Sequence, residues 1–375
     1  MSPEQPQRLL LDLLARPQAA TSLTPGQWET LLCQARAANL IGTLAERVDA
    51  AGIPLPDGLA RHLRGVAQLS ARQRESVLWE AHLLDRCLAP LGIPVVLLKG
   101  SAYVLRQLPV ARGRLFGDID ILVPREHLGA VEVAMMTAGW TSAKLHPYDQ
   151  RYYRQWMHEL PPMLNVRRGT ILDIHHTLLP LTSRHHPDPA LLFAAAEALP
   201  GFSCLRTPSP ADLVIHSITH LFHEGEFHNG LRDLVDIDGL LRHFAARDAG
   251  FWDGLVPRAR QLQLASPLFL GLHFAQHVLA SPIPPAVLAA AAAAGAPSAP
   301  GLRLLETLFS HALRPQHPRC LGPMSGFALW LLYVRAHWLR MPPHLLTVHL
   351  TRKAWRSVFP EPERTRHDDE PGLPG

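Results

Sequence analysis

The spacing of apolar residues changes twice along this chain of 375 residues, and this change restricts the fold more than any other feature. Before residue 94 and after residue 180, apolar residues recur at the three- and four-residue intervals of amphipathic helices. Between these positions they form short runs or alternate with polar residues, as they do in strands. Strands gathered in the middle of a helical chain predict an α+β fold, in which a small mixed β-sheet is flanked by helical regions.

This pattern divides the sequence into four segments. We expect an N-terminal helical region at 1–93, an α/β core at 94–180, a C-terminal helical domain at 181–359 and a disordered tail at 360–375. The tail is rich in proline and charge, a composition that buries too little apolar surface to fold. Hydrophobic residues make up 47% of the chain, so the other segments can form a sizeable core.

Charge and cysteine content argue against several classes of protein. The formal net charge is +4, and the basic residues form no concentrated stripe, which disfavours long nucleic acid as a partner. The four cysteines lie far apart, so we expect free thiols rather than a disulfide framework or a metal site. The N-terminus does not read as a signal peptide, and the apolar run at 327–334 is far too short to span a bilayer. We therefore expect a cytoplasmic protein with no membrane span.

Two aspartates one residue apart lie on a predicted strand. The segment 118–123 alternates, so Asp118 and Asp120 face the same side. A predicted hairpin at 163–175 carries Asp173 on its second strand, between apolar neighbours. If the two strands are neighbours, three carboxylates meet at one edge of the sheet. Hard divalent ions prefer oxygen ligands, so we predict that these aspartates are catalytic and bind Mg²⁺, or Mn²⁺ in its place.

A glycine and a serine follow the first predicted strand, 95–98. A glycine at position 100 lets the backbone approach a phosphate, and Gly100 and Ser101 open a predicted helix whose N-terminus favours anions. Lys99 and Arg114 flank the same region. Each could neutralise a bound triphosphate, or could simply balance the acidic cluster.

These motifs, in this order, resemble the DNA polymerase β-like nucleotidyltransferase superfamily. That superfamily has a Gly-Ser or Gly-Gly turn after a strand, an Asp-x-Asp strand and a third acid on a later strand. Within it, the sequence resembles the bacterial uncharacterised nucleotidyltransferase family, which typically shows a Leu-Lys-Gly turn, an arginine four residues before the first aspartate and Leu-Val after the second. The matching residues are 98–100, Arg114 and 122–123, and a similar Arg-x-Leu-x-Asp-Ile segment occurs at 232–237. The resemblance covers about residues 70–245.

The resemblance implies transfer of a nucleoside monophosphate from an NTP, which we expect to be ATP, to an acceptor with release of pyrophosphate. Asp118 and Asp120 would ligate both metal ions, and Asp173 would ligate the catalytic ion and help to activate the acceptor. Gly100 and Ser101 would hold the β- and γ-phosphates.

The acceptor is not identified by these motifs. A protein side chain, a sugar or a small molecule is favoured over long nucleic acid. Two other functions stay open, namely a catalytically silent nucleotide-binding or regulatory protein on the same fold, and a metal-dependent phosphohydrolase on a different one.

Several residues outside the central motif have two possible roles. One face of a predicted helix carries four polar residues: Asp212, His216, His220 and His223. Packing under the active site is favoured over zinc binding for this face, because no H-E-x-x-H motif is present. On the next helix, Arg232 and Asp236 could pair with each other or line the nucleotide or acceptor cleft. His175 shares a strand face with Asp173, and we expect it to orient an acid rather than to ligate the metal.

Aromatic residues are frequent near the C-terminus. We predict that four of them are buried in the core: Trp330, Tyr333, Trp338 and Trp355.

Overall fold

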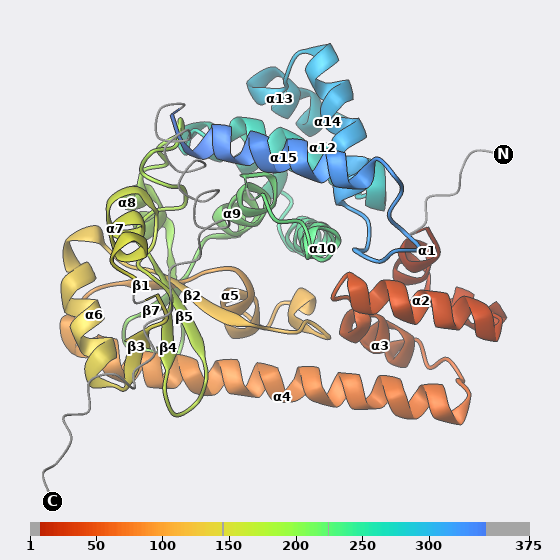
Figure 1. Cartoon of the computed structure of the whole chain (residues 1–375), viewed down its shortest axis with the longest axis horizontal. Helices are drawn as coiled ribbons and strands as arrows, with labels where there is room; N and C mark the ends of the chain where they lie inside the picture. The colour runs from red at the N-terminus through yellow and green to blue at the C-terminus, as the bar shows by residue number, and fades with distance from the viewer. Residues whose placement is uncertain (1–7, 145, 224, 343–375) are drawn as a thin grey trace, which may run out of the picture.

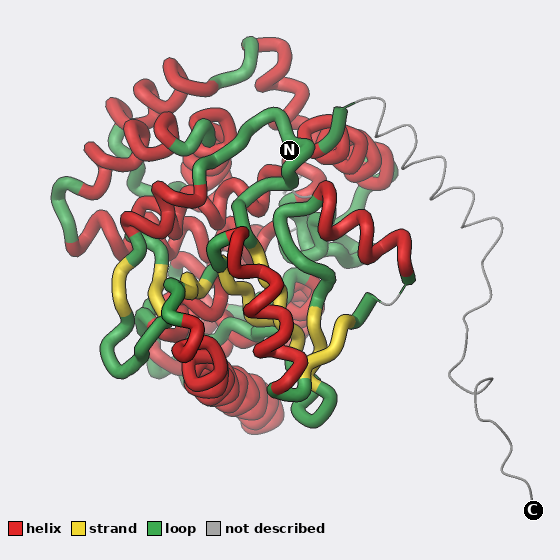
Figure 2. The backbone as a smooth tube through the Cα atoms, turned by 90° about the vertical axis from the view of Figure 1, so that its left-hand side faces the viewer, coloured by secondary structure: helices red, strands yellow, loops and turns green. Residues whose placement is uncertain are grey.

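The computed structural model describes residues 8–144, 146–223 and 225–342 (Figures 1 and 2). The N-terminal region consists of four α-helices: α1 (Arg8–Ala15), α2 (Pro25–Ala37), α3 (Ile41–Ala50) and α4 (Asp57–Leu88). Thr24 caps α2, because its side chain accepts the N–H of Gln27 and the Gln27 side chain accepts the N–H of Thr24. The predicted tail at 360–375 and Trp355 lie outside the described residues.

A seven-stranded sheet forms in the described part of the chain, in the order β3-β4-β5-β2-β1-β7-β6. Its strands are β1 (Val95–Leu97), β2 (Asp118–Leu122), β3 (Trp140–Ser142), β4 (Met163–Asn165), β5 (Ile171–His175), β6 (Glu197–Ala198) and β7 (Leu205–Thr207). β2 runs parallel to β5 and antiparallel to β1, while β1 runs parallel to β7. The predicted α+β class, with a mixed sheet and flanking helices, is confirmed, and so is the hairpin formed by β4 and β5.

Three of the strands were not predicted from the sequence. β3, β6 and β7 contain only two or three residues each, and they lack the apolar run of β1 and the tight turn that marks the hairpin of β4 and β5. β6 and β7 follow residue 180, in a segment that the sequence pattern assigned to helices. Pairing with β1 extends the sheet into this segment.

Short helices surround the sheet and longer ones complete the chain. Those between strands are α5 (Lys99–Leu105), α6 (Leu128–Thr137), α7 (Pro147–Trp156) and α8 (Pro189–Ala195). The later helices are α9 (Pro210–His223), α10 (Gly230–Arg247), α11 (Phe251–Gln261), α12 (Ala265–Leu279), α13 (Pro285–Gly295), α14 (Ala299–Ala312) and α15 (Ser325–Arg340). Short 3₁₀-helices are η1 (Pro17–Ser22), η2 (Ala89–Leu91), η3 (Pro109–Ala111) and η4 (Arg125–His127). Figure 1 shows α4 along one side of the molecule and α15 along the opposite side, with α5, α9 and α10 between them.

Two aromatic residues of α15 contradict the predicted burial. Trp330 is 56% exposed and Trp338 is 45% exposed. The helix instead buries the small and aliphatic residues Ala328, Leu332 and Ala336, which recur every four positions and form its inner face. The tryptophans lie off this inner face, so the core prediction is wrong for both.

No single helix in the described residues is both long and apolar enough to cross a bilayer. Together, α13 and α14 meet the criteria of length and composition, but the pair is bent by 110°.

Asp85 ties α4 to the sheet. Its carboxylate accepts the backbone N–H groups of Ser203, Cys204 and Leu205, at 2.8–3.3 Å for Oδ1. These residues lead into and begin β7, the parallel neighbour of β1. A side chain on α4 therefore fixes the position of β7 in the sheet.

Removal of this carboxylate is expected to destabilise the protein. Asp85→Ala leaves three N–H groups without their acceptor and should lower the free energy of unfolding by about 2–3 kcal/mol, measured by urea denaturation. Asp85→Asn keeps one carbonyl oxygen as an acceptor and should lose less. Equal stability of Asp85→Ala and the unmodified protein would contradict this account.

Candidate active site

The pairing of β2 with β5 brings the three predicted aspartates together. Asp120 lies directly beside Asp173 in the parallel register, and Asp118 is two residues earlier on β2. One carboxylate oxygen from each of the three lies within 4.8 Å of the others. The expected adjacency of the two strands is confirmed. The structure thus brings Asp173 into one cluster of oxygen donors with two aspartates that precede it by more than 50 positions.

Asp120 is buried and accepts two hydrogen bonds on the same oxygen. Lys99 Nζ lies 2.7 Å from Asp120 Oδ1, and His175 Nε2 lies 3.0 Å from it. Burial by itself would raise the pKa of Asp120, but the Lys99 ammonium and the bond from His175 outweigh burial and hold this pKa well below its usual range. Asp120 is therefore ionised at neutral pH, and His175 orients an acid, as expected.

The pKa of Asp173 is shifted in the opposite direction from that of Asp120. Its Oδ1 is buried and has no hydrogen-bond partner among the described residues. Burial, followed by the charges of Asp120 and Glu159, raises the pKa of Asp173 to about 7. The charge of Asp120 and burial also raise the pKa of Asp118. Crowded carboxylates with an unpartnered oxygen fit a hard divalent cation, which prefers oxygen ligands and relieves their repulsion.

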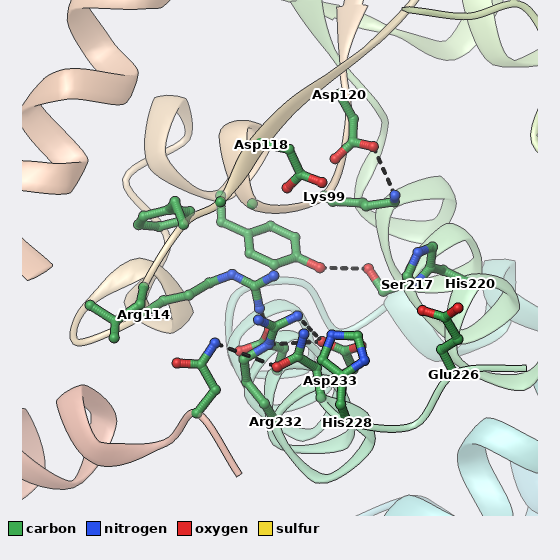
Figure 3. Close-up of a pocket in the computed structure, with 18 residues that line it drawn as sticks. Lys99, Arg114, Asp118, Asp120, Ser217, His220, Glu226, His228, Arg232 and Asp233 are labelled. Carbon is green, nitrogen blue, oxygen red and sulfur yellow. Dashed lines mark hydrogen bonds and ion pairs between the residues drawn. The ribbon is translucent and has the colours of Figure 1, made fainter. Parts of the chain in front are cut away.

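A cavity of about 410 Å³ opens beside these acids (Figure 3). Asp118, Asp120 and Lys99 lie on one side of it, and α10 provides the opposite wall. Between the two walls, the Tyr103 hydroxyl lies 2.7 Å from Ser217 Oγ. The volume is typical of sites that bind small molecules or cofactors.

The opposite wall carries charges that are balanced in pairs. Arg114 forms an ion pair with Asp236, and Arg232 Nη2 lies 2.7 Å from Asp233 Oδ1. The possible pair between Arg232 and Asp236 is replaced by these contacts, because Arg114 reaches α10 from the loop before β2. Both Arg232 and Asp236 line the cavity. Burial, then the charge of Arg232, lowers the pKa of Arg114 to about 10, so its guanidinium is still charged at neutral pH.

The two residues predicted to hold phosphates differ in their surroundings. Gly100 lines the cavity, and a Cβ there would lie 2.9 Å from the Phe116 ring, so a glycine permits this close approach. Ser101 is buried and is not among the cavity-lining residues; its hydroxyl donates to the Leu98 carbonyl at 2.7 Å. The Ser101 hydroxyl is therefore engaged by the backbone at the start of α5.

The N-terminal helices also reach the cavity, which the sequence did not indicate. Asn39 lines it, and its side-chain amide lies 3.4 Å from the Asn229 amide oxygen. Gly42 in α3 packs directly on Gly113, the residue before Arg114, and a side chain on either glycine would collide with the other backbone. Gly113 has a φ of +73°, a conformation that favours glycine.

On the histidine-bearing face of α9, Asp212 and the histidines have different surroundings. Asp212 accepts two hydrogen bonds from Arg258, at 2.7 and 2.8 Å. Both of its carboxylate oxygens are therefore bonded to an arginine and not directed at a metal site. His216 and His220 line a small cavity that also borders Lys99 and His175. The four residues of this helix face do not form a metal-binding group within the described chain.

Glu159 is a further site residue that the sequence did not indicate. Its Oε2 lies 3.4 Å from His175 Nδ1, on the side opposite Asp120. Glu159 pairs with His175 through an isolated antiparallel bridge, a contact that no local pattern around residue 159 reveals.

One comparison with known proteins gives a match. A family model described as "Uncharacterised nucleotidyltransferase" matches residues 24–280. No curated protein and no solved structure matches the chain. The matched range contains the whole sheet, the three aspartates and both walls of the cavity.

The pKa of Asp173 predicts how metal affinity depends on pH. A cation competes with the proton for this carboxylate, so Mn²⁺ affinity, measured by titration calorimetry, should rise about tenfold from pH 6 to pH 8. Asp173→Asn should bind more weakly and show a flatter profile. The unmodified protein would contradict this expectation if its Mn²⁺ affinity did not change over that range.

The stability of the metal-free protein should fall over the pH range in which its metal affinity rises. The raised pKa means that the folded state favours protonated Asp173. The contribution of Asp173 to the free energy of unfolding is therefore greatest below about pH 4 and falls as the pH rises to about 7.

Proposed function

The chain belongs to the uncharacterised nucleotidyltransferase family, and on this premise we propose that it transfers a nucleoside monophosphate from an NTP to an acceptor and releases pyrophosphate. The observation that carries the proposal is the strand register that sets Asp120 beside Asp173, with Asp118 nearby, next to a cavity of suitable size. ATP is the nucleotide that we expect.

Mg²⁺, or Mn²⁺ in its place, is the proposed cofactor. Asp118 and Asp120 would hold both ions, and Asp173 would hold the catalytic one. When bound, the ions would supply activation of the attacking group and neutralisation of the triphosphate and the leaving pyrophosphate. The oxygen-only donor set and the unpartnered oxygen of Asp173 support this assignment.

Asp173 is the proposed proton acceptor. The oxygen of the acceptor hydroxyl attacks the α-phosphorus, its proton passes to Asp173, and the bond from the α-phosphorus to the bridging oxygen of the β-phosphate breaks. In the cation-free site, burial and the neighbouring carboxylates raise the proton affinity of Asp173, which is the direction that a general base needs. Asp120 is held ionised by Lys99 and His175, so it does not compete for this proton.

The cations around the cavity suit a polyanionic substrate. Lys99 and Arg114 both line it, and we propose that they neutralise the triphosphate, while the backbone at Gly100 and Ser101 holds the β- and γ-phosphates. Arg232 and Asp236, on the opposite wall, would contact the nucleotide or the acceptor. The modest cavity volume favours a side chain, sugar or small molecule as the acceptor over long nucleic acid.

Transfer of label from the α-phosphate tests this proposal. The protein is incubated with each α-³²P-labelled NTP, Mg²⁺ and cell extract, and label should move to a macromolecule or metabolite. The double variant Asp118→Asn/Asp120→Asn should lower the rate by at least about 10²–10³-fold, because it removes preorganised charge at the reacting centre. Asp253→Asn, at an exposed position on α11, is the matched control and should act like the unmodified protein.

The products separate the other functions. Nucleotide binding without transfer would indicate the silent protein, and release of inorganic phosphate without pyrophosphate would indicate a phosphohydrolase. Equal labelling by the unmodified protein and the double variant would remove the proposed mechanism.

A further inference from the structure

A second group of metal-ligating side chains lies behind the three aspartates. His158, Glu159 and His175 each offer one ligand atom, and these atoms lie within 4.8 Å of one another. His175 Nδ1 is 3.4 Å from Glu159 Oε2, and His158 Nε2 is 3.9 Å from the same oxygen. Two ligands at tetrahedral angles around a zinc ion, with bonds of about 2.0–2.2 Å, are about 3.4 Å apart. The atoms of His175 and Glu159 therefore already have the required separation.

The hydrogen bond to Asp120 prepares His175 for such a role. A carboxylate accepts but does not donate, so His175 Nε2 carries the proton and donates it to Asp120 Oδ1. In the neutral ring, the lone pair of Nδ1 then faces Glu159, which is a second acceptor. Either a proton on Nδ1 or a cation between these two atoms resolves this contact. A histidine held by a carboxylate through its other nitrogen is the usual arrangement of a metal-bound imidazole.

The backbone holds the three ligands in place. Glu159 and His175 face each other across an antiparallel bridge. The N–H of His176 donates to the His158 carbonyl at 2.9 Å, and the N–H of Leu160 donates to the Ile174 carbonyl at 2.8 Å. The ligands thus lie on paired extended segments, which position side chains more accurately than a free loop.

Two buried nitrogens at or beside this group have no hydrogen-bond partner among the described residues. His158 and His175 border a cavity of about 10 Å³, close to the room that one water needs. His216 on α9 lines the same cavity and is 5% exposed, and its Nδ1 has no hydrogen-bond partner among the described residues. His158 Nδ1 is likewise without such a partner there. A metal-bound water in this cavity would supply a fourth ligand within reach of His216.

The charge and the donor atoms fit a borderline divalent metal. The group includes the carboxylate of Glu159, and two further carboxylates, Asp120 and Asp173, interact with it. Lys99 offsets one of these charges through its ion pair with Asp120, so carboxylates still outnumber the ammonium group here. Two imidazoles with one carboxylate suit Zn²⁺, whereas the oxygen-only aspartate cluster suits Mg²⁺.

We propose that His158, Glu159 and His175 form a zinc site separate from the aspartate cluster, which fixes the His175 ring against Asp120. The proposal concerns metal binding, so it stands or falls independently of the transfer reaction.

Zinc binding by the full-length protein tests the proposal. Metal-free protein is titrated with Zn²⁺ in excess Mg²⁺, which occupies the oxygen-only cluster, and one equivalent of Zn²⁺ should bind. His158→Ala and Glu159→Gln should each weaken binding by at least about tenfold, since changes to the outer shell of a metal already cost about 10- to 100-fold. Co²⁺ in place of Zn²⁺ should give visible absorption typical of tetrahedral coordination, and both variants should lose it.

Two controls make the result specific. Asp118→Asn alters the aspartate cluster, and His186→Ala removes an exposed histidine; both should keep the affinity for Zn²⁺. Circular dichroism establishes that each variant is folded, and Glu159→Gln keeps the shape of the side chain. The proposal is overturned if no equivalent of Zn²⁺ binds, if the folded His158→Ala and Glu159→Gln proteins bind it normally, or if Asp118→Asn loses binding to the same extent as they do.

Discussion

The parallel pairing of β2 with β5 is the constraint on which the site depends. Side chains alternate along a strand, so a slip of one residue in this register would send Asp173 to the opposite face of the sheet from Asp120. The turn between β4 and β5 is hydrogen-bonded to α4. Glu80 on this helix accepts hydrogen bonds from Arg168 at 2.5 Å and from Thr170 at 2.8 Å. A buried acid on an N-terminal helix thus helps to fix the register that brings the aspartates together.

Electrostatic balance differs between the two walls of the cavity. On the sheet side, carboxylates outnumber cations, and the unequal environments of Asp120 and Asp173 move their pKa values in opposite directions. On the α10 side, each acid has an arginine beside it. The sheet side can therefore accept additional positive charge, whereas the opposite wall is already neutralised by its own pairs.

Local patterns predicted most of the fold and the central acids. The Asp-x-Asp alternation, the hairpin and the helices α9 and α10 are each encoded within a short stretch, so their residues could be recognised without the structure. Contacts between distant segments could not be recognised. β7 owes its position to β1 and Asp85, and Glu159 joins the site through a single bridge to His175. The exposed tryptophans of α15 show the same limit, because periodicity does not reveal which helix face finds a neighbour.

The contact between Gly42 and Gly113 fixes the position of the loop that carries Arg114 to the cavity. The two backbones are in direct contact there, so no side chain can change its rotamer and move them apart. The residues at 226 and 228, by contrast, line the same cavity and are exposed to solvent. Selection between small and bulky acceptors would therefore depend on the exposed side chains at 226 and 228. The contact between the two glycines would keep the Arg114 loop at a constant distance from α3.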